Sequence, residues 1–427
     1  MEILNYIFAF FVSFSYSGAY ICFAIAILFL YKYWKVIRYE PLLFFIILFM
    51  VYGCLLAFFS EYQKEAFNEM YAYFMNWCGA FILGYFFINK TRKIRLVLTY
   101  VSFFVFILFL SIMSYYGLFF KEILGFKFLM WGRLSADMYP IGCAALCLLI
   151  SCILLILLLF KLDVLKQYKI ILFVMYVISI IALFLTGSRG YYISGFITYF
   201  LIFSFYYYKT RSVKILVGFI LTFFVIISGI FLTNVSLQER IQKTSLTADE
   251  SITTRFELYH VALLIFKDHP IFGVGPSNGG RQFKYFQIAS EKLTEYGHLH
   301  SIYLNILADF GIIGFILFIL IIICLFRRLI QVYKEQNSLL ALALIFSWIS
   351  LLIGDTFDVF LSGNRVAMEY FWLTGIVLGG TQNKKNDIQN HVLKNEIKQI
   401  KFKILFFKKF LLNYCLAKNR YKLNGLE

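Results

Sequence analysis

The chain has 427 residues, of which 61% are hydrophobic and 21% aromatic, and its formal net charge at pH 7 is +17. Apolar runs of about 20 residues recur along it, and each is long enough to cross a bilayer as a helix. Most basic residues lie in short segments between these runs and at the C-terminal end, which argues against a nucleic-acid-binding protein. We therefore expect an all-α polytopic membrane protein with about 11–12 transmembrane helices.

The first apolar run, residues 3–31, is long for one upright helix and short for two. The stretch Ser13–Gly18 can divide it, so residues 1–34 form either one span or a hairpin of short helices. Further spans are expected near 41–59, 69–89, 96–118, 138–160, 170–187, 191–208, 214–233, 301–326, 338–358 and 366–380.

Charge alternates from one connection to the next. Five short connections contain three or four Lys and Arg residues each, whereas most of the short connections between them contain one. Since loops rich in Lys and Arg stay in the cytoplasm, we place the basic set inside and the other set outside. Residues 1–233 then form the N-terminal transmembrane helices, 234–299 an extracytoplasmic loop, 300–380 the C-terminal transmembrane helices, and 381–427 a basic cytoplasmic tail.

The outer loop at 234–299 is the one long connection between the expected spans. Thr253 and Thr254 precede a mostly apolar segment that Pro270 ends, which predicts a short helix near 254–268. The sequence GVGPSNGG follows at 273–280 and is typical of a turn.

Three arginines on the outer side are candidates for binding an anion. Arg189 lies in LTGSRGYY, between two spans joined by almost no loop, where an arginine is costly unless it pairs with another group. It can snorkel, form a salt bridge with Asp355 or Asp358, or hold a diphosphate. Arg255, in the expected first turn of the loop helix, is disfavoured there by the helix dipole unless an anion is nearby, although it can also be a solvated surface residue. Arg281, after the glycine turn, is a weaker candidate of the same kind.

His300 stands where the outer loop meets the next span, in YGHLHSIYLNILADFGIIGFI. A histidine titrates near neutral pH, so His300 can act in proton transfer; it can equally cap a span at the membrane interface. His298 completes an HxH pair, but a metal site needs a third and a fourth ligand, and the sequence has no recognisable pattern for them. GVGPSNGG lacks the GK[ST] of a P-loop, and its GxSxG match around Ser277 lies in a proline-containing turn, which disfavours a serine hydrolase.

Three motifs together carry a resemblance to a known family. HSIYLNILADFGIIG fits His–[Asn/Ser/Gln]–nine residues–Gly–two residues–Gly, which resembles the signature of the O-antigen ligase and O-antigen polymerase superfamily. TTRFELYHVALLIFKDHPIFGVGPSN looks like the outer-loop segment that precedes this signature in the family, and LTGSRGYYISGF resembles the family's arginine turn. The resemblance covers about residues 170–380 in the expected order, and Ser301 stands where asparagine is commoner.

The resemblance implies a metal-independent, inverting glycosyltransferase that acts outside the cytoplasmic membrane and needs no cofactor. Its partners would be a glycan donor on undecaprenyl diphosphate, an acceptor saccharide or lipid-linked glycan, and membrane lipids. Arg189 and Arg255 would bind the diphosphate, with Arg281 as a weaker partner, and His300 would act as base on the acceptor hydroxyl or orient it.

Two questions stay open at this point. The product would be surface polysaccharide, such as O-antigen, capsule or exopolysaccharide, and the residues do not separate a polymerase from a ligase; the greater number of polymerases in the family favours a polymerase slightly. The alternative function is a transporter or flippase for a lipid-linked or anionic solute, which would also use an arginine at membrane depth. The absence of an inverted repeat in the sequence and the large outer loop favour the enzyme.

Overall fold

A computed structural model gives the fold of the chain. It describes residues 2–14, 16–28, 40–86, 92–123, 125–160, 167–213, 217, 250–289, 295–362 and 364–379. Most of the expected span at 214–233, the loop up to residue 249 and the tail 381–427 lie outside the described residues.

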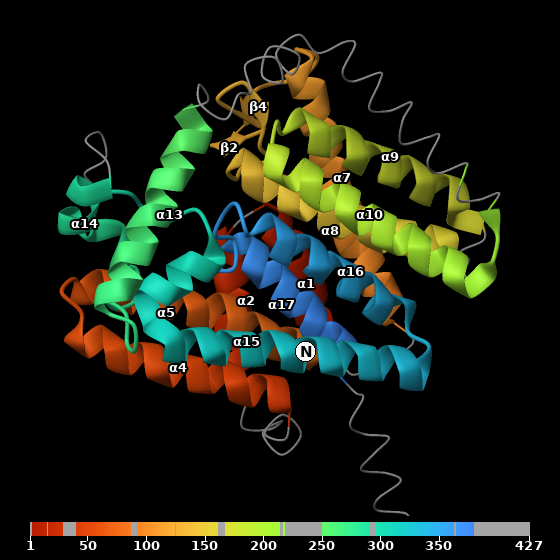
Figure 1. The fold of residues 1–427 in the computed structure, drawn as a ribbon. Helices are drawn as coiled ribbons and strands as arrows, with labels where there is room; N and C mark the ends of the chain where they lie inside the picture. The colour runs from red at the N-terminus through yellow and green to blue at the C-terminus, as the bar shows by residue number, and fades with distance from the viewer. Residues whose placement is uncertain are drawn as a thin grey trace, which may run out of the picture. The chain divides into compact units, whose positions relative to one another are not determined.

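The described part of the chain is almost entirely helical (Figure 1). In chain order its elements are α1 (Glu2–Phe14), α2 (Tyr16–Leu28), α4 (Pro41–Phe59), α5 (Gln63–Tyr73), the π-helical turn η1 (Phe74–Gly79), α6 (Ala80–Tyr85), α7 (Lys93–Tyr115), β1 (Glu122–Ile123), β2 (Phe126–Lys127), β3 (Leu129–Met130), β4 (Arg133–Leu134), α8 (Pro140–Leu159), α9 (Lys169–Leu185), α10 (Arg189–Thr210), α13 (Glu250–Asp268), the 3₁₀ turn η3 (Gly279–Arg281), α14 (Phe283–Ala289), α15 (Ile302–Gln336), α16 (Leu339–Gly354) and α17 (Arg365–Leu378).

Four of the described helices, α4, α7, α8 and α15, are long and apolar enough to cross a membrane, and α1, α2, α9 and α16 are shorter apolar helices. The first apolar run is divided between α1 and α2, which pack against each other. α8 is the most enclosed of the four long helices, with 94% of its apolar window buried. The fold is therefore that of an all-α polytopic membrane protein, as the composition predicts. Two short antiparallel hairpins, β1–β2 and β3–β4, lie in the connection between α7 and α8.

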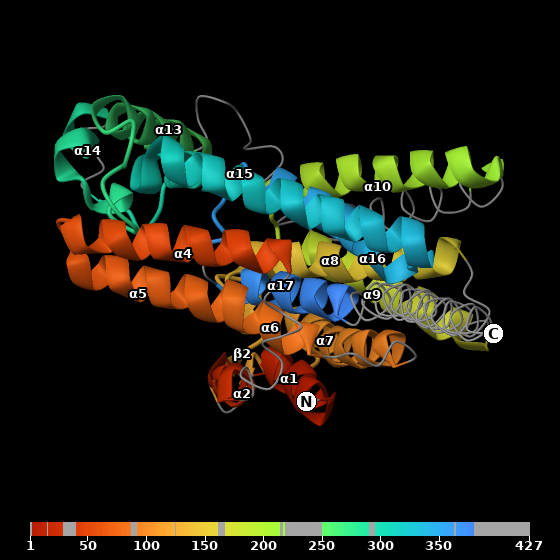
Figure 2. The same ribbon diagram turned by 90° about the horizontal axis from the view of Figure 1, so that it is seen from below.

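α4 and α15 lie side by side along the molecule (Figures 1 and 2). A buried ion pair joins the start of α4 to the far part of α15, because Arg328 Nε and one terminal nitrogen contact the two carboxylate oxygens of Glu40 at 2.8 and 2.9 Å. Tyr85 donates a further hydrogen bond to the same carboxylate at 3.3 Å. Such a pair fixes the register of the two helices, and removal of one partner would leave a charge buried without compensation.

α15 is interrupted inside the expected span. Gly311 has φ +64° and ψ −167°, so a short outer part, residues 302–310, is set off from the rest of the helix. A β-carbon on Gly311 would overlap the carbonyl oxygen of Ile271, so only glycine fits this conformation and this contact.

The segment 270–275, which follows α13, docks into this break. The N–H of Ile312 donates to the carbonyl of Pro270 at 2.8 Å, and the N–H of Gly275 donates to the carbonyl of Asp309 at 2.8 Å. Within a membrane, backbone groups that a broken helix frees must find partners in the protein. The loop supplies them, and this fixes α13 against the start of α15.

A buried polar cluster fixes the start of α17. Arg365 Nε donates to Glu369 at 3.0 Å, and a terminal nitrogen of Arg365 donates to the carbonyl of Ser13 at 3.0 Å. Tyr100 of α7 also donates to Glu369. The turn that precedes α17 is therefore attached to a rigid part of the bundle.

Candidate active site

The connection between α16 and α17 contains an acidic turn, residues 355–361, that is held from several sides. Tyr191 in the first turn of α10 donates to Asp355 Oδ1 at 3.0 Å, and the N–H of Leu361 donates to the other oxygen of that carboxylate at 2.9 Å. The indole N–H of Trp77, in the π-helical turn, donates to the carbonyl of Leu361 at 2.8 Å. Three segments far apart in sequence therefore meet at the acidic turn.

The start of α15 is attached to the same turn. The N–H of Ile302 lies 3.0 Å from both the carbonyl of Asp355 and the carbonyl of Asp358. Ser301 before it is extended, and His300 has φ +49°, a left-handed conformation that costs a non-glycine residue about 1–3 kcal/mol. This conformation turns the chain so that His300 faces the acidic turn.

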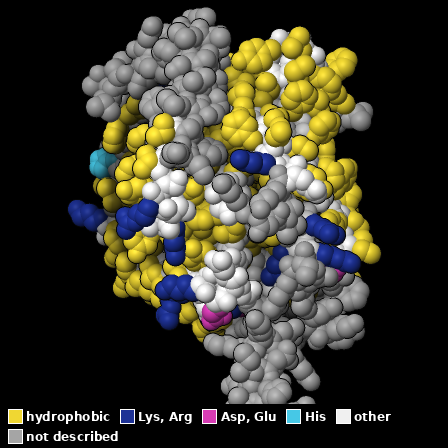
Figure 3. Space-filling view, turned by 90° about the vertical axis from the view of Figure 1, so that its right-hand side faces the viewer, with side chains coloured by type: hydrophobic (Ala, Val, Ile, Leu, Met, Phe, Trp, Pro, Cys, Tyr) yellow, Lys and Arg dark blue, Asp and Glu magenta, His cyan; other side chains and the backbone are white. Residues whose placement is uncertain are grey.

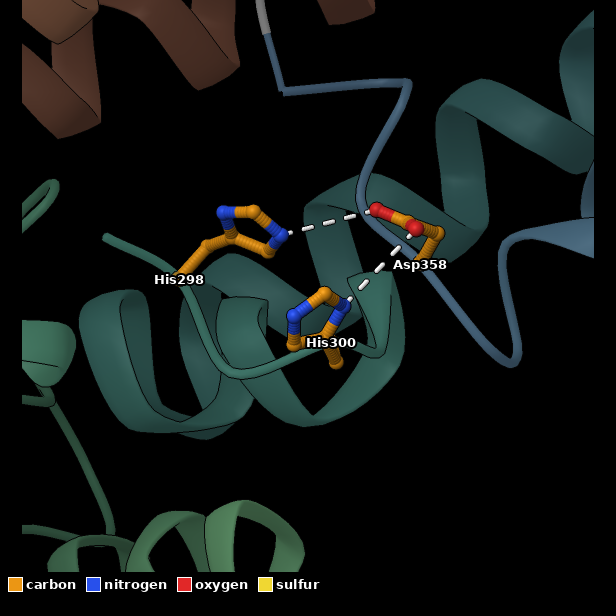
Figure 4. Close-up of side chains that lie close together, drawn as sticks. All are labelled: His298, His300 and Asp358. Atoms are coloured by element: carbon orange, nitrogen blue, oxygen red, sulfur yellow. Dashed lines mark ion pairs between the residues drawn. The ribbon is translucent and has the colours of Figure 1, made fainter. Parts of the chain in front are cut away.

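Two histidines contact the same carboxylate (Figure 4). His298 Nε2 lies 3.5 Å from Asp358 Oδ1, and His300 Nδ1 lies 3.7 Å from Asp358 Oδ2. The two imidazole centroids are 4.4 Å apart. The side chain of Asp358 is 7% exposed, that of His300 15% and that of His298 40%, so His298 is the outermost of the three.

The electrostatics of the group keep Asp358 ionised. Burial alone would raise the pKa of its carboxyl, but the contacts with His298 and His300 outweigh burial and hold that pKa below its usual range. The contact of 3.7 Å is longer than a hydrogen bond, but an ionised carboxylate can act only as an acceptor, so it favours the His300 tautomer with its proton on Nδ1. The Nε2 of His300 is then left with a free lone pair and can accept a proton from another group.

Arg189 is the first residue of α10, beside the acidic turn. Its neighbour Gly190 packs against the side chain of Phe357, and Tyr191 binds Asp355. Asp355, beside the start of α10, binds Tyr191 and a backbone N–H, and Asp358 contacts the two histidines.

A second arginine, Arg133 in β4, shapes the turn in which Arg189 lies. It donates from Nε to the carbonyl of Thr186 at 2.6 Å and from a terminal nitrogen to Ser188 Oγ at 3.0 Å. The hairpin between α7 and α8 thus holds the residues that precede Arg189, which the sequence alone did not indicate.

Arg255 lies one turn before Tyr259 in α13, and Tyr259 contacts the site. The hydroxyl of Tyr259 lies 3.2 Å from the carbonyl of His300 and 3.0 Å from the carbonyl of Thr356, so α13 is joined to both the histidines and the acidic turn. Burial raises the pKa of Tyr259, while the charge of Arg255, one helical turn earlier, acts in the opposite direction.

Arg255 does not lie in the first turn of its helix, so the predicted position at the helix start is wrong. The chain is already helical at Glu250, so Arg255 lies in the second turn of α13, beyond the first-turn amides that make a helix start unfavourable for a cation. Thr253 and Thr254 are inside the helix rather than capping it, and an acidic residue, Glu250, lies near its start.

Arg281 is the last residue of the 3₁₀ turn η3. One of its terminal nitrogens donates to the hydroxyl of Ser277 at 2.9 Å and to the carbonyl of the same residue. It lines a cavity of about 390 Å³ together with Glu295 and Tyr296. The ring of Tyr296 is 5.3 Å from that of His300, so this cavity adjoins the histidine pair.

A chain of hydrogen bonds connects the glycine turn to the histidines. Asp309 accepts from the N–H of Gly279 at 2.7 Å and from the side-chain amide of Asn305 at 2.8 Å. Asn305 in turn accepts from the N–H of Leu299 at 3.2 Å. Since Leu299 separates the two histidines, Asp309 and the glycine turn fix their position.

Sequence reasoning missed Asp358 as a partner of His300, although it named this acid as a possible partner of Arg189. The available signal was its place: two acids, in DTFD, directly after an apolar run on the outer side of the predicted topology. Arg133 and Tyr259 gave no signal that separates them from other residues in their loops.

The described part of the outer loop, α10 and the start of α15 fall within a region that matches a known family. Residues 173–319 match the protein family described as O-Antigen ligase. This region of the chain is similar to the O-antigen ligase and polymerase superfamily. The resemblance inferred from the three motifs is confirmed, and the matched region contains Arg189, Arg255, Arg281 and His300 but ends before Asp358.

The chain is also similar to a second bacterial protein. The chain is 30% identical over 128 residues to an uncharacterized protein of Haemophilus influenzae, across 28% of this chain and 32% of that protein. The match therefore spans about a third of the relative's length. The family match and the apolar helices together indicate a multi-pass protein of the bacterial inner membrane.

Proposed function

We propose that this protein is an extracytoplasmic, metal-independent, inverting glycosyltransferase. It transfers a glycan from undecaprenyl diphosphate to an acceptor saccharide in the synthesis of surface polysaccharide. The observation that carries the proposal is the contact of His300 Nδ1 with buried Asp358 at 3.7 Å. The same acidic turn is contacted by Tyr191 of α10 and Tyr259 of α13, the helices that contain Arg189 and Arg255.

His300 is the base in this proposal. Ionised Asp358 keeps the proton of neutral His300 on Nδ1 and leaves the lone pair on Nε2, and Nε2 removes the proton of the attacking hydroxyl as that oxygen bonds to the anomeric carbon. The bond from the anomeric carbon to the diphosphate oxygen breaks on the opposite face, so the configuration inverts. The proton stays on His300, and the electron pair leaves with undecaprenyl diphosphate.

The arginines bind the leaving group. Arg189 and Arg255 would contact the diphosphate oxygens and offset the negative charge that grows on them as the bond breaks. The position of Arg133 supports this role for Arg189, because Arg133 fixes the preceding turn through two hydrogen bonds. Arg281 stays a weaker candidate for the diphosphate, and the cavity that it lines with Tyr296 beside His300 would take the acceptor saccharide.

The charge distribution supports an extracytoplasmic site. α10 begins at Arg189 and α15 begins after His300, and both end in turns that carry Lys209 and Lys334. Figure 3 looks at the end of the bundle opposite α13 and α14, and Lys and Arg side chains are spread over it with few acidic ones. Basic ends face the cytoplasm, so the histidines would face outward.

Reporter fusions test this topology. A periplasm-active reporter fused after Asn278 is expected to be active, and one fused after Lys385 inactive, with a cytoplasmic reporter giving the reverse pattern. Cytoplasmic activity at Asn278 would contradict both the topology and the proposed reaction, because the donor glycan would then lie on the wrong side of the membrane.

A reconstituted assay tests the reaction. Purified full-length protein in vesicles, given a lipid-linked glycan in the presence of EDTA, is expected to form a longer glycan and release undecaprenyl diphosphate. Growth of the glycan on undecaprenyl diphosphate identifies the favoured polymerase, and transfer to a final lipid acceptor identifies a ligase. Movement of the lipid-linked glycan across the vesicle without a new glycosidic bond would instead identify the alternative, a flippase.

A further inference from the structure

The histidine pair and Asp358 form a donor set that the proposed reaction does not fully use. His298 Nε2, His300 Nδ1 and one oxygen of Asp358 all lie within 4.8 Å of one another (Figure 4). Both nitrogens are buried atoms without a hydrogen bond, and their contacts with Asp358, at 3.5 and 3.7 Å, are longer than hydrogen bonds. Three lone-pair donors therefore converge on one small space.

These spacings are close to those around a tetrahedral metal ion. Ligand atoms bound to Zn²⁺ at 2.0–2.2 Å in a tetrahedron lie roughly 3.4 Å from one another. The nitrogen–oxygen separations, 3.5 Å from His298 to Oδ1 and 3.7 Å from His300 to Oδ2, are close to this value, but they end on different oxygens of Asp358. To share one ion, the three donor atoms, which lie within 4.8 Å of one another, must move closer, and His298, whose side chain is 40% exposed, has room to turn.

We propose that His298, His300 and Asp358 bind Zn²⁺, and that the bound ion inhibits glycan transfer. Two imidazoles and a carboxylate suit zinc, whereas Mg²⁺ and Ca²⁺ prefer oxygen ligands alone. The HxH pair supplies two ligands from one loop, and the acidic turn supplies the third, which the sequence did not reveal. The fourth position would take water from the open side of His298.

Inhibition follows from the nitrogen that the metal occupies. In the proposed reaction the ionised Asp358 keeps the proton of neutral His300 on Nδ1, which leaves the lone pair on Nε2. A metal on Nδ1 shifts the proton of the neutral imidazole to Nε2, so Nε2 becomes a donor and cannot accept the proton of the acceptor hydroxyl. Zinc and catalysis thus require opposite tautomers of the same side chain.

Metal binding is measured without reference to activity. Full-length protein, purified in detergent and freed of metal with EDTA, is titrated with Co²⁺, whose visible absorption reports tetrahedral coordination, and with Zn²⁺ against a chromophoric chelator. We expect one Zn²⁺ per chain. His298→Ala and Asp358→Asn should each weaken binding by more than the roughly 10–100-fold that loss of an outer-shell partner costs. His260→Ala, which removes an exposed histidine of the same loop, should leave binding unchanged.

A second measurement links binding to inhibition and rests on the proposed function. Zn²⁺ should lower the transfer rate of the wild type at the concentration at which it binds, and His298→Ala should need at least ten times more Zn²⁺ for the same effect. Equal Zn²⁺ affinity in wild type and His298→Ala, or no stoichiometric binding, overturns the zinc site. If the protein binds Zn²⁺ as expected but transfers no glycan even without it, the zinc site stands and the proposed function fails.

Discussion

Replacement of His300 by alanine is expected to lower the rate of glycan transfer by roughly 10²–10⁴-fold, the contribution of one well-placed acid–base group. His300 has one nitrogen beside the buried carboxylate of Asp358, and its side chain is less exposed than that of His298, which contacts the same carboxylate (15% against 40%). The initial rate of glycan formation in the vesicle assay measures the loss. Protein level in the membrane should stay normal, because His300 lies before the first residue of α15 and satisfies no group within a span.

His298→Ala is the matched control for this experiment. It removes an imidazole two residues away that contacts the same carboxylate, but it leaves the contact of His300 Nδ1 with Asp358 in place. We expect little loss of activity in the absence of zinc. A dead His298→Ala variant beside an active His300→Ala variant would show that the base is assigned to the wrong histidine.

The Asp358→Asn variant tests whether His300 acts as a base or only orients the acceptor. An asparagine side chain can donate a hydrogen bond to His300 Nδ1, which favours the tautomer with the proton on Nε2. If Nε2 must accept a proton, the loss should approach that of His300→Ala, while acceptor affinity changes little. If His300 only orients the acceptor through a donated hydrogen bond, the Asp358→Asn variant should keep most of its activity.

The positions of the helices could be predicted from the sequence because each depends on a local apolar run. The expected span at 41–59 coincides with α4, and that at 138–160 differs from α8 by two residues at its start and one at its end. The loop helix expected near 254–268 ends where predicted but is already helical at Glu250, because threonines resemble caps in sequence even when they lie inside a helix.

The break in α15 could not be predicted from the same signals. Gly311 lies in an apolar run that continues on both sides, and an isolated glycine is tolerated in a helix. What divides the helix is the docking of 270–275, about 40 residues earlier in the chain, through backbone hydrogen bonds that have no side-chain pattern. The glycine-rich sequence read as a turn is therefore also the partner of the broken helix.

The site was predictable only in part for a similar reason. His300, Arg189 and Arg255 each carry a local anomaly, a titratable or charged group beside an apolar run. The role of Asp358 depends on tertiary structure alone, because the N–H of Ile302 joins the start of α15 to the acidic turn. No spacing rule connects His300 to an acid 58 residues later, so the sequence could not show that Asp358 lies beside the two histidines.

Arg189→Lys is expected to be nearly as damaging as Arg189→Ala, with a loss on the order of 10²–10³-fold in the rate of transfer, comparable to removal of one donor to a developing negative charge. A guanidinium binds two diphosphate oxygens at once in a fixed plane, whereas an ammonium is a compact charge on a flexible stem. Retention of charge should therefore recover less than about tenfold of the loss. Arg211→Lys, the same substitution at the other end of α10, is the control and should have no effect.

The division of the loss between kcat and KM shows what Arg189 does. The diphosphate is charged before the reaction and gains charge as its bond to the sugar breaks, so an arginine that follows this change should affect kcat more than KM. An arginine that only holds the donor would raise KM and leave kcat unchanged. If kcat and KM of Arg189→Lys are close to those of the wild type, the planar two-point contact of the guanidinium is unnecessary, and the start of α10 does not bind the leaving group.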